Sequence, residues 1–172
     1  SESVMRMGQI REPIQDNRRN YGMFLAALPV GEWHTGWVRD GVYGVVAQAM
    51  TGHIEEAKIG TEFFLNAEAG FFSSYLRGRD YRISSVRYYG NGLEEGDYNW
   101  QGPNVETDGF GLVLWGARAV LQYSCDVDWL DTPTLYGDTV YEALKQTADD
   151  IVGLMEANDL PTAECSIWEV HW

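Results

Sequence analysis

Glu169 is the carboxylate whose sequence neighbours best suit it to acid catalysis. Its neighbours Ile167, Trp168, Val170 and Trp172 give it the most apolar local setting of any carboxylate in the chain. Burial against apolar and aromatic walls raises the pKa of a carboxyl, which then holds a proton that it can donate near neutral pH. Cleavage of a glycosidic bond needs such an acid, together with a second carboxylate that activates water or attacks the sugar. The alternative is a structural role, in which Glu169 caps a helix or pairs with an arginine.

A turn-rich stretch at residues 31–41, GEWHTGWVRDG, combines two tryptophans, a histidine and the adjacent pair Arg39 and Asp40. Adjacent residues on a helix do not face each other, because side-chain contacts there run at three or four residues. Arg39 and Asp40 must therefore find separate partners. An indole such as that of Trp37 offers a flat apolar face on which a sugar ring can stack. The stretch fits a ligand site and a buried ion pair with core tryptophans equally well.

Glu106 and Asp108 form a second pair of carboxylates, just before a predicted helix. Acidic residues are common at helix starts because the free amide groups there favour negative charge, so we interpret Asp108 as a cap. The neighbouring acids Glu94–Glu95 and Asp149–Asp150 are predicted to be solvated, and Cys125 is predicted to be a small buried residue. Serine-hydrolase, Walker and His-Glu-x-x-His motifs do not occur, and the cysteines and histidines lack the spacing of a metal site. The sequence therefore indicates no cofactor and no metal.

The charge of the chain restricts its partners. The 172 residues include 26 acidic and 12 basic ones, for a net charge of −14. Such a surface repels phosphate backbones and anionic lipids, so we expect neither nucleic acid nor a membrane as a partner. A hydrophobic content of 45% is typical of a globular chain, and no apolar run approaches the ~20 residues that span a membrane. No signal peptide is visible, but in a fragment this would not reveal the compartment.

Apolar residues at helical spacing predict four helices, over residues 40–50, 53–65, 108–124 and 135–155, after a shorter helical pattern at 3–15. Thr51–Gly52 is a tight link, so the first two helices should form an antiparallel hairpin. The segment 131–133, Asp-Thr-Pro, supplies a cap and a first-turn proline for the last helix. Residues 69–104 are rich in glycine and tyrosine and predict a functional loop, in which 81–83 and 86–88 could pair as a short β-hairpin.

These elements predict an all-α fold of antiparallel helical hairpins with essentially no sheet. No repeat with a period of ~20–50 residues occurs, so a regular solenoid is not indicated. A closed ring of hairpins, with the long loops gathered at one end, fits the order of the elements better. The chain has helices for only about half of such a ring. We therefore expect residues 1–172 to be the N-terminal part of a single larger catalytic domain.

Three short blocks resemble glycoside hydrolase family 15, the glucoamylase-like family. The stretch Trp37-Val38-Arg39-Asp40, followed by a helical hairpin, is similar to the family's Trp-x-Arg-Asp-(Ala/Gly) pattern. The segment 104–111, with Asp108-Gly109-Phe110-Gly111 opening a helix, resembles the family's second aromatic and polar block. Ser166-Ile167-Trp168-Glu169 resembles its (Leu/Ile)-Trp-Glu block. The three blocks occur in the family's order, and the resemblance covers the first half of its domain.

The resemblance implies an (α/α)6 toroid that inverts the anomeric carbon and releases glucose from the non-reducing ends of α-glucans or α-glucosides. Glu169 would be the general acid, and Arg39 and Asp40 would hold the hydroxyls of the terminal glucosyl unit. The remaining implied site residues are Trp37, Trp100 and Trp168, which would line the pocket, and Asp108, which would act as a support. The implied partners are an oligosaccharide or α-glucoside substrate and the C-terminal half of the same domain.

The chain departs from the family pattern in two places. The family's general base lies in the later half of its domain, and no residue here matches it. We therefore expect no carboxylate of this chain to lie opposite Glu169 at the roughly 6.5–9.5 Å of an inverting pair. Val170-His171 also replaces the acid that usually follows Trp-Glu, which leaves starch-type dextrins, isomalto-linked glucan and trehalose open as substrates.

Two other functions remain open. A phosphorolytic glycosidase of similar toroidal shape would use phosphate in place of the base, and it would need an anion site lined by Arg77, Arg79 or Arg87. A glucan-binding or regulatory module would keep the toroid without catalysis. The behaviour of a Glu169→Gln variant separates these functions.

Overall fold

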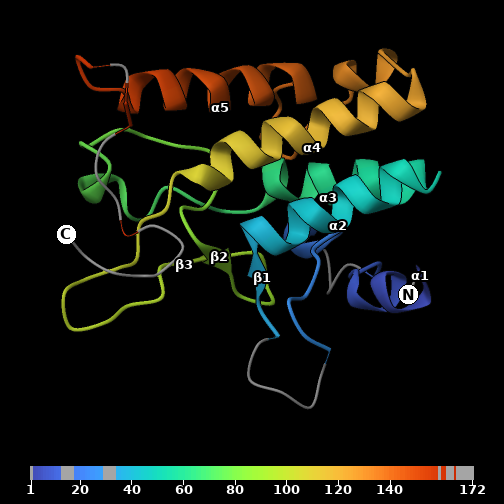
Figure 1. Cartoon of the computed structure of the whole chain (residues 1–172), viewed down its shortest axis with the longest axis horizontal. Helices are drawn as coiled ribbons and strands as arrows, with labels where there is room; N and C mark the ends of the chain where they lie inside the picture. Colours follow the sequence, from blue (N-terminus) through green and yellow to red (C-terminus); the bar gives the residue numbers. More distant parts are fainter. Residues whose placement is uncertain (1, 13–17, 29–33, 159, 162–164, 166–172) are drawn as a thin grey trace.

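The computed structural model describes residues 2–12, 18–28, 34–158, 160–161 and 165. Within these ranges the helices are α1 (Glu2–Gly8), α2 (Val38–Met50), α3 (Ile54–Asn66), α4 (Asp108–Ser124) and α5 (Val140–Leu154). The shorter elements are the 3₁₀ turns η1 (Arg18–Asn20), η2 (Ser73–Tyr75) and η3 (Asp128–Asp131) and the strands β1 (Gly36–Trp37), β2 (Arg87–Tyr88) and β3 (Glu94–Glu95). In Figure 1, α4 lies between α5 and the pair α2–α3, and α1 lies apart from this group.

The predicted hairpin of the first two long helices is confirmed. The α2 helix ends at Met50, and Gly52 adopts a φ of +85° that glycine accommodates without strain. The Thr51 hydroxyl donates a hydrogen bond to the Ala47 carbonyl at 2.8 Å, which satisfies one of the free carbonyls at the helix end. His53 is then the N-cap of α3, so the chain reverses within three residues.

The α2 and α4 helices run parallel and approach each other closely. A Cβ atom at Gly109 would lie 3.0 Å from Val38, and one at Gly116 would lie 3.3 Å from Val42. The first turn of α4 therefore packs against the first turn of α2, and Gly116, further along α4, packs against Val42, further along α2. Glycine at the contact lets the two backbones approach because no side chain separates them. The result is that the amino ends of both helices lie at the same end of the molecule.

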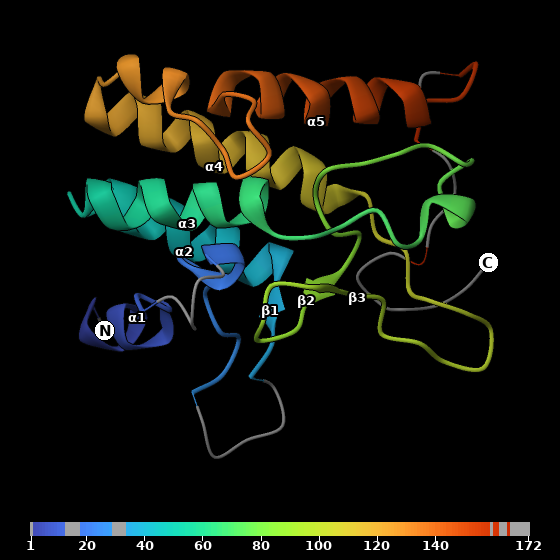
Figure 2. The ribbon, with the colours of Figure 1, turned by 180° about the vertical axis from the view of Figure 1, so that it is seen from behind.

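The longest connection, between α3 and α4, lies at that end, whereas the connection between α4 and α5 lies at the opposite end. Figures 1 and 2 show the segment between α3 and α4 on the side where α2 and α4 begin, whereas the short α2–α3 link lies at the opposite end. This arrangement and the largely helical content agree with the predicted helical fold. Closure of the hairpins into a six-hairpin toroid stays a prediction. No helix in the described ranges is long and apolar enough to cross a membrane.

The glycine- and tyrosine-rich segment between α3 and α4 contributes to the core. Tyr88 is fully buried, and its ring centroid lies 5.0 Å from that of Phe63 in α3. Ile83 is also fully buried. Glu94, which we expected to be solvated, is only 3% exposed. It accepts hydrogen bonds from the Tyr81 hydroxyl and from the backbone amides of Phe71 and Ser85, so this loop is fixed from inside.

The predicted β-hairpin between 81–83 and 86–88 is wrong. The strand β2 instead lies between β1 and β3 in a small antiparallel sheet, with Tyr88 opposite Gly36 on one side and Glu94 on the other. The side chains explain the difference, because the Ser84 amide donates to the Tyr88 hydroxyl and the Ser84 hydroxyl donates to the Arg87 carbonyl. The turn between paired strands lies later in the chain, between β2 and β3, and it contains Gly92, which has a φ of +81°. The expectation of essentially no sheet misses these two-residue strands.

Two other local predictions are corrected at the far end of the molecule. The last helix begins at Val140 instead of near residue 135, because Thr139 and Glu142 form a capping box. Pro133 lies before it, in a bridge with Thr139. Cys125 is exposed and has a φ of +53° at the C-cap of α4, so it ends the helix and does not fill the core.

Glycine positions in the helices give a test of this packing. A Cβ atom at Gly60 of α3 would lie 2.8 Å from Val45 and 2.9 Å from Phe24, whereas one at the exposed Gly111 of α4 would meet nothing within 4 Å. We expect Gly60→Ala to lower the free energy of unfolding by about 1–3 kcal/mol through overpacking. Gly111→Ala should raise it by about 0.5–1 kcal/mol through helix propensity. Urea denaturation of both variants measures this, and equal effects would contradict the helix contact.

Candidate functional site

The site lies where β1 enters α2. The Val38 amide donates a hydrogen bond to the Val86 carbonyl at 3.1 Å, so the backbone at the start of α2 is tied to the sheet. The Arg87 guanidinium of β2 lies over the Trp37 ring, 4.5 Å from its centroid. Arg87 also pairs with Glu95 and with Asp97. One face of the Trp37 indole is therefore held by a cation that has its own carboxylate partners.

Arg39 joins the first turns of α2 and α4. Its Nη2 atom donates to Glu106 Oε2 at 2.6 Å and to Asp108 Oδ2 at 3.0 Å, and its Nε donates to Asp108 Oδ2 at 3.1 Å. Burial alone would lower the pKa of Arg39, but the hydrogen bond with Glu106 and the charges of Asp108 and Glu106 raise it overall. Nη1 takes part in none of these hydrogen bonds.

Glu106 and Asp108 have different surroundings. Glu106 is 5% exposed, and its amide donates to the Ser85 carbonyl at 3.0 Å. Asp108 is exposed and is the first residue of α4. The interpretation of Asp108 as a cap is wrong, because Thr107 is the N-cap and its side chain makes no capping hydrogen bond. Asp108 instead accepts two hydrogen bonds from Nη2 of Arg39 and thereby orients that side chain.

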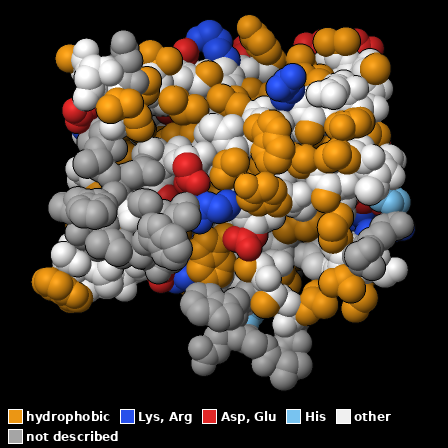
Figure 3. Space-filling model, in the orientation of Figure 1, with side chains coloured by type: hydrophobic (Ala, Val, Ile, Leu, Met, Phe, Trp, Pro, Cys, Tyr) orange, Lys and Arg blue, Asp and Glu red, His pale blue; other side chains and the backbone are white. Residues whose placement is uncertain are grey.

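Trp37 and Asp40 line a cavity of about 350 Å³ together with Ala26 and Ala27. Asp40 follows Arg39 on α2, and it also lines an adjoining groove of about 500 Å³ toward α1. The two neighbouring residues thus have separate surroundings, as their helical spacing predicts. Figure 3 shows acidic and basic side chains next to hydrophobic ones where α2 begins. An indole and a carboxylate acceptor in the cavity lining suit a neutral ligand that carries hydroxyl groups.

Among the described site residues, Arg39, Trp100 and Asp108 are not part of this cavity lining. Trp100 is 91% exposed, in the loop between β3 and α4. Trp168 and Glu169 lie outside the described residues. Cys165, however, is buried beside the start of α4, where its amide donates to the Val105 carbonyl at 2.9 Å and its Sγ accepts from the Val105 amide at 3.4 Å.

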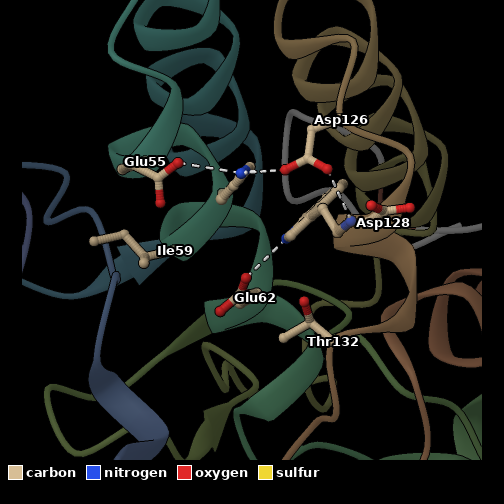
Figure 4. A pocket seen from close by; sticks show the side chains of 8 residues that line it. Glu55, Ile59, Glu62, Asp126, Asp128 and Thr132 are labelled. Carbon is tan, nitrogen blue, oxygen red and sulfur yellow. Dashed lines mark hydrogen bonds and ion pairs between the residues drawn. The ribbon is translucent and has the colours of Figure 1, made fainter.

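A second cavity, which the sequence did not reveal, lies between α3 and η3 (Figure 4). Its volume is about 400 Å³, and Lys58 bridges Glu55 at 3.1 Å and Asp126 at 2.7 Å on its wall. The indole N–H of Trp129 donates to Glu62 at 2.8 Å. Lys58 and Asp126 are 68 residues apart, so no local pattern could have shown the pairing.

Three comparisons, with protein families, curated proteins and solved structures, found no match for this chain. The described residues also contain no group of three or more histidine, cysteine, aspartate or glutamate side chains that could hold a metal ion.

The Arg39 bridge can be tested through stability. Glu106→Gln leaves Arg39 without its buried anion, so we expect the free energy of unfolding to fall by about 1–3 kcal/mol. Asp108→Asn is the matched control, because this carboxylate is exposed and surface ion pairs contribute about 0–1 kcal/mol. Denaturation in urea, with the double variant to measure coupling, checks this. A larger loss for Asp108→Asn than for Glu106→Gln would contradict the arrangement.

Glu62 gives a pH prediction for the second cavity. Burial raises the pKa of Glu62 above its ordinary 4.5, although the Trp129 hydrogen bond favours the ionised form. The folded protein therefore binds this proton more tightly than the unfolded chain does, and stability falls as the pH rises from about 4.5 through the raised value. Glu62→Gln should flatten the unfolding free energy over that pH range. Asp149→Asn, at an exposed side chain in α5, is the control, and parallel curves for wild type and Glu62→Gln would refute the prediction.

Proposed function

We propose that residues 1–172 are the N-terminal part of an inverting, exo-acting glycoside hydrolase of the glucoamylase-like type. The observation that carries this proposal is the contact between the first two sequence blocks at one end of the helices, where Cys165, just before the third block, is also bonded. Arg39 of the first block is bonded to Asp108 of the second. Cys165, one residue before the third block, is hydrogen-bonded to Val105 of the second.

The side chains at the start of α2 suit a terminal glucosyl unit. In the proposed complex the sugar ring stacks on Trp37, Asp40 accepts hydrogen bonds from its hydroxyls, and Nη1 of Arg39 donates one. Asp108 supports Arg39 from the side, which supports the positioning role that the resemblance implies for both residues. Trp100 and Trp168 complete the pocket in this proposal. The ligand is neutral, as favoured by a chain with a net charge of −14.

Glu169 is the residue that we propose for acid catalysis. In this proposal Glu169 is the general acid, which donates its proton to the glycosidic oxygen as the bond to the anomeric carbon breaks. Water attacks the opposite face of the sugar, activated by a carboxylate in the C-terminal half of the domain. Glucose then leaves with inverted configuration. The parallel α2 and α4 helices, each followed by an antiparallel partner, support a continuing (α/α)6 toroid.

The phosphorolytic alternative receives no support from the arginines that it would need. Arg77 pairs with Glu156 at 3.0 Å, and Arg87 pairs with Glu95 and Asp97. Arg79 packs against Gly153 of α5. None of the three lines the cavity at Trp37 and Asp40, so phosphate would find no cluster of unneutralised cations there.

The test is a Glu169→Gln substitution in the full-length protein that carries this chain. We expect glucose release from an α-glucan to fall by about 10²–10⁴-fold, while binding of the sugar persists because the amide keeps the shape of the carboxyl. Asp149→Asn is the control, since Asp149 forms an exposed pair with Lys145. Proton NMR of the first product should show β-glucose from an α-linked substrate. Undiminished turnover in Glu169→Gln would overturn the proposal, and sugar binding without any turnover in the wild type would indicate a binding module.

A further inference from the structure

Exposed aromatic rings cluster on two loops at the end where α4 begins. Tyr75 of η2 is 52% exposed and Tyr98, after β3, is 62% exposed. A Cβ atom at Gly102 would lie 3.4 Å from the Tyr75 ring, so Tyr75 lies against the loop that carries Tyr98. The Phe72 and Tyr98 ring centroids lie 5.7 Å apart. We call Phe72, Tyr75 and Tyr98 the aromatic platform. Figures 1 and 2 show η2 and the loop after β3 on the same side of the molecule, away from α1.

The backbone beneath the aromatic platform is fixed. A Cβ atom at Gly96 would lie 2.6 Å from the Phe72 ring, so only glycine lets the ring approach the loop. The Asn104 amide donates to the Gly96 carbonyl at 2.7 Å, and the Asn104 side chain donates to Asp97 at 3.0 Å. Rings that are already held in place lose little conformational freedom when a ligand binds.

The same contacts connect the aromatic platform to the cavity at Trp37. Asp97, adjacent to Tyr98, pairs with Arg87 at 2.6 Å. Arg87 lies over the Trp37 ring. A single charged side chain therefore holds both the cavity wall and the loop that carries Tyr98.

The surroundings of the aromatic platform are electrically neutralised. Arg77, two residues after Tyr75, pairs with Glu156 at 3.0 Å, and Asp97 is paired with Arg87. The chain as a whole carries a charge of −14, which disfavours polyanions. Flat apolar rings with phenolic hydroxyls at their edges match the apolar face and hydroxyl rim of a pyranose ring.

We infer that the aromatic platform is a carbohydrate-binding surface, separate from the Trp37–Asp40 cavity, that holds successive pyranose units of a neutral polysaccharide. Tyr75 and Tyr98 supply the stacking faces, and their hydroxyl groups supply donors and acceptors for the sugar hydroxyls. Sugar binding by the aromatic platform requires no catalysis, so it can be tested independently of the proposed hydrolase activity.

The test is affinity electrophoresis of the full-length protein in native gels that contain soluble starch or, in parallel, dextran. We expect one of the polymers to retard the wild type, and Tyr98→Ala and Tyr75→Ala to weaken this binding by about tenfold, the loss expected when one aromatic contact of about 1.4 kcal/mol is removed. Tyr141→Ala is the control, because Tyr141 of α5 is similarly exposed at 56%. The same measurements in the Glu169→Gln background separate the aromatic platform from turnover.

The outcomes distinguish the two proposals. Retardation that depends on Tyr75 and Tyr98 in a protein without glucose release supports the aromatic platform and overturns the hydrolase. Glucose release with retardation unchanged by either substitution overturns the aromatic platform and leaves the hydrolase. A third outcome is that no variant is retarded and that size-exclusion chromatography shows a wild-type dimer that Tyr98→Ala loses. This outcome identifies the aromatic platform as a protein contact and overturns the inference. Circular dichroism confirms that the variants are folded.

Discussion

The close approach of α2 and α4 is the constraint on which the loop end of the molecule depends. Gly109 and Gly116 allow the two backbones to pack against Val38 and Val42 with almost no intervening volume. Since the helices are parallel, their amino termini lie side by side, and Arg39 of one reaches Glu106 and Asp108 beside the other. Antiparallel helices in the same position would have separated these side chains by the length of a helix. The charged cluster is thus a result of helix direction, and its carboxylates lie where two helix dipoles favour negative charge.

The connection between α3 and α4 is held by polar groups that are buried and paired. Glu94 accepts hydrogen bonds from a tyrosine hydroxyl and two backbone amides, which satisfies a carboxylate that is 3% exposed. Arg87 joins β2 to Asp97 and covers Trp37. A segment without regular secondary structure can in this way be as well defined as a helix. This explains how an exposed set of tyrosines and a half-buried tryptophan keep fixed positions next to each other.

The sequence was sufficient for the features that depend on local periodicity. The α4 helix begins and ends as its apolar spacing predicts, and Gly52 marks the turn between α2 and α3. The sequence-based prediction failed where side-chain hydrogen bonds determine the structure. The Tyr88 hydroxyl accepts a hydrogen bond from the Ser84 amide where a β-hairpin was expected. Glu94 is buried because it accepts hydrogen bonds from donors up to 23 residues away. The predicted separation of Arg39 and Asp40 followed from helix geometry. The partners of Arg39 did not, because they lie 67 and 69 residues further along the chain.

The contacts that assemble the site have consequences for how the protein folds. The α2–α3 hairpin closes across three residues, so its contacts form with little loss of chain entropy. Arg39 and Glu106 are separated by 67 residues, and Val105 and Cys165 by 60, so these contacts require most of the chain to be ordered first. We therefore expect the charged cluster to form after the α2–α3 hairpin during folding.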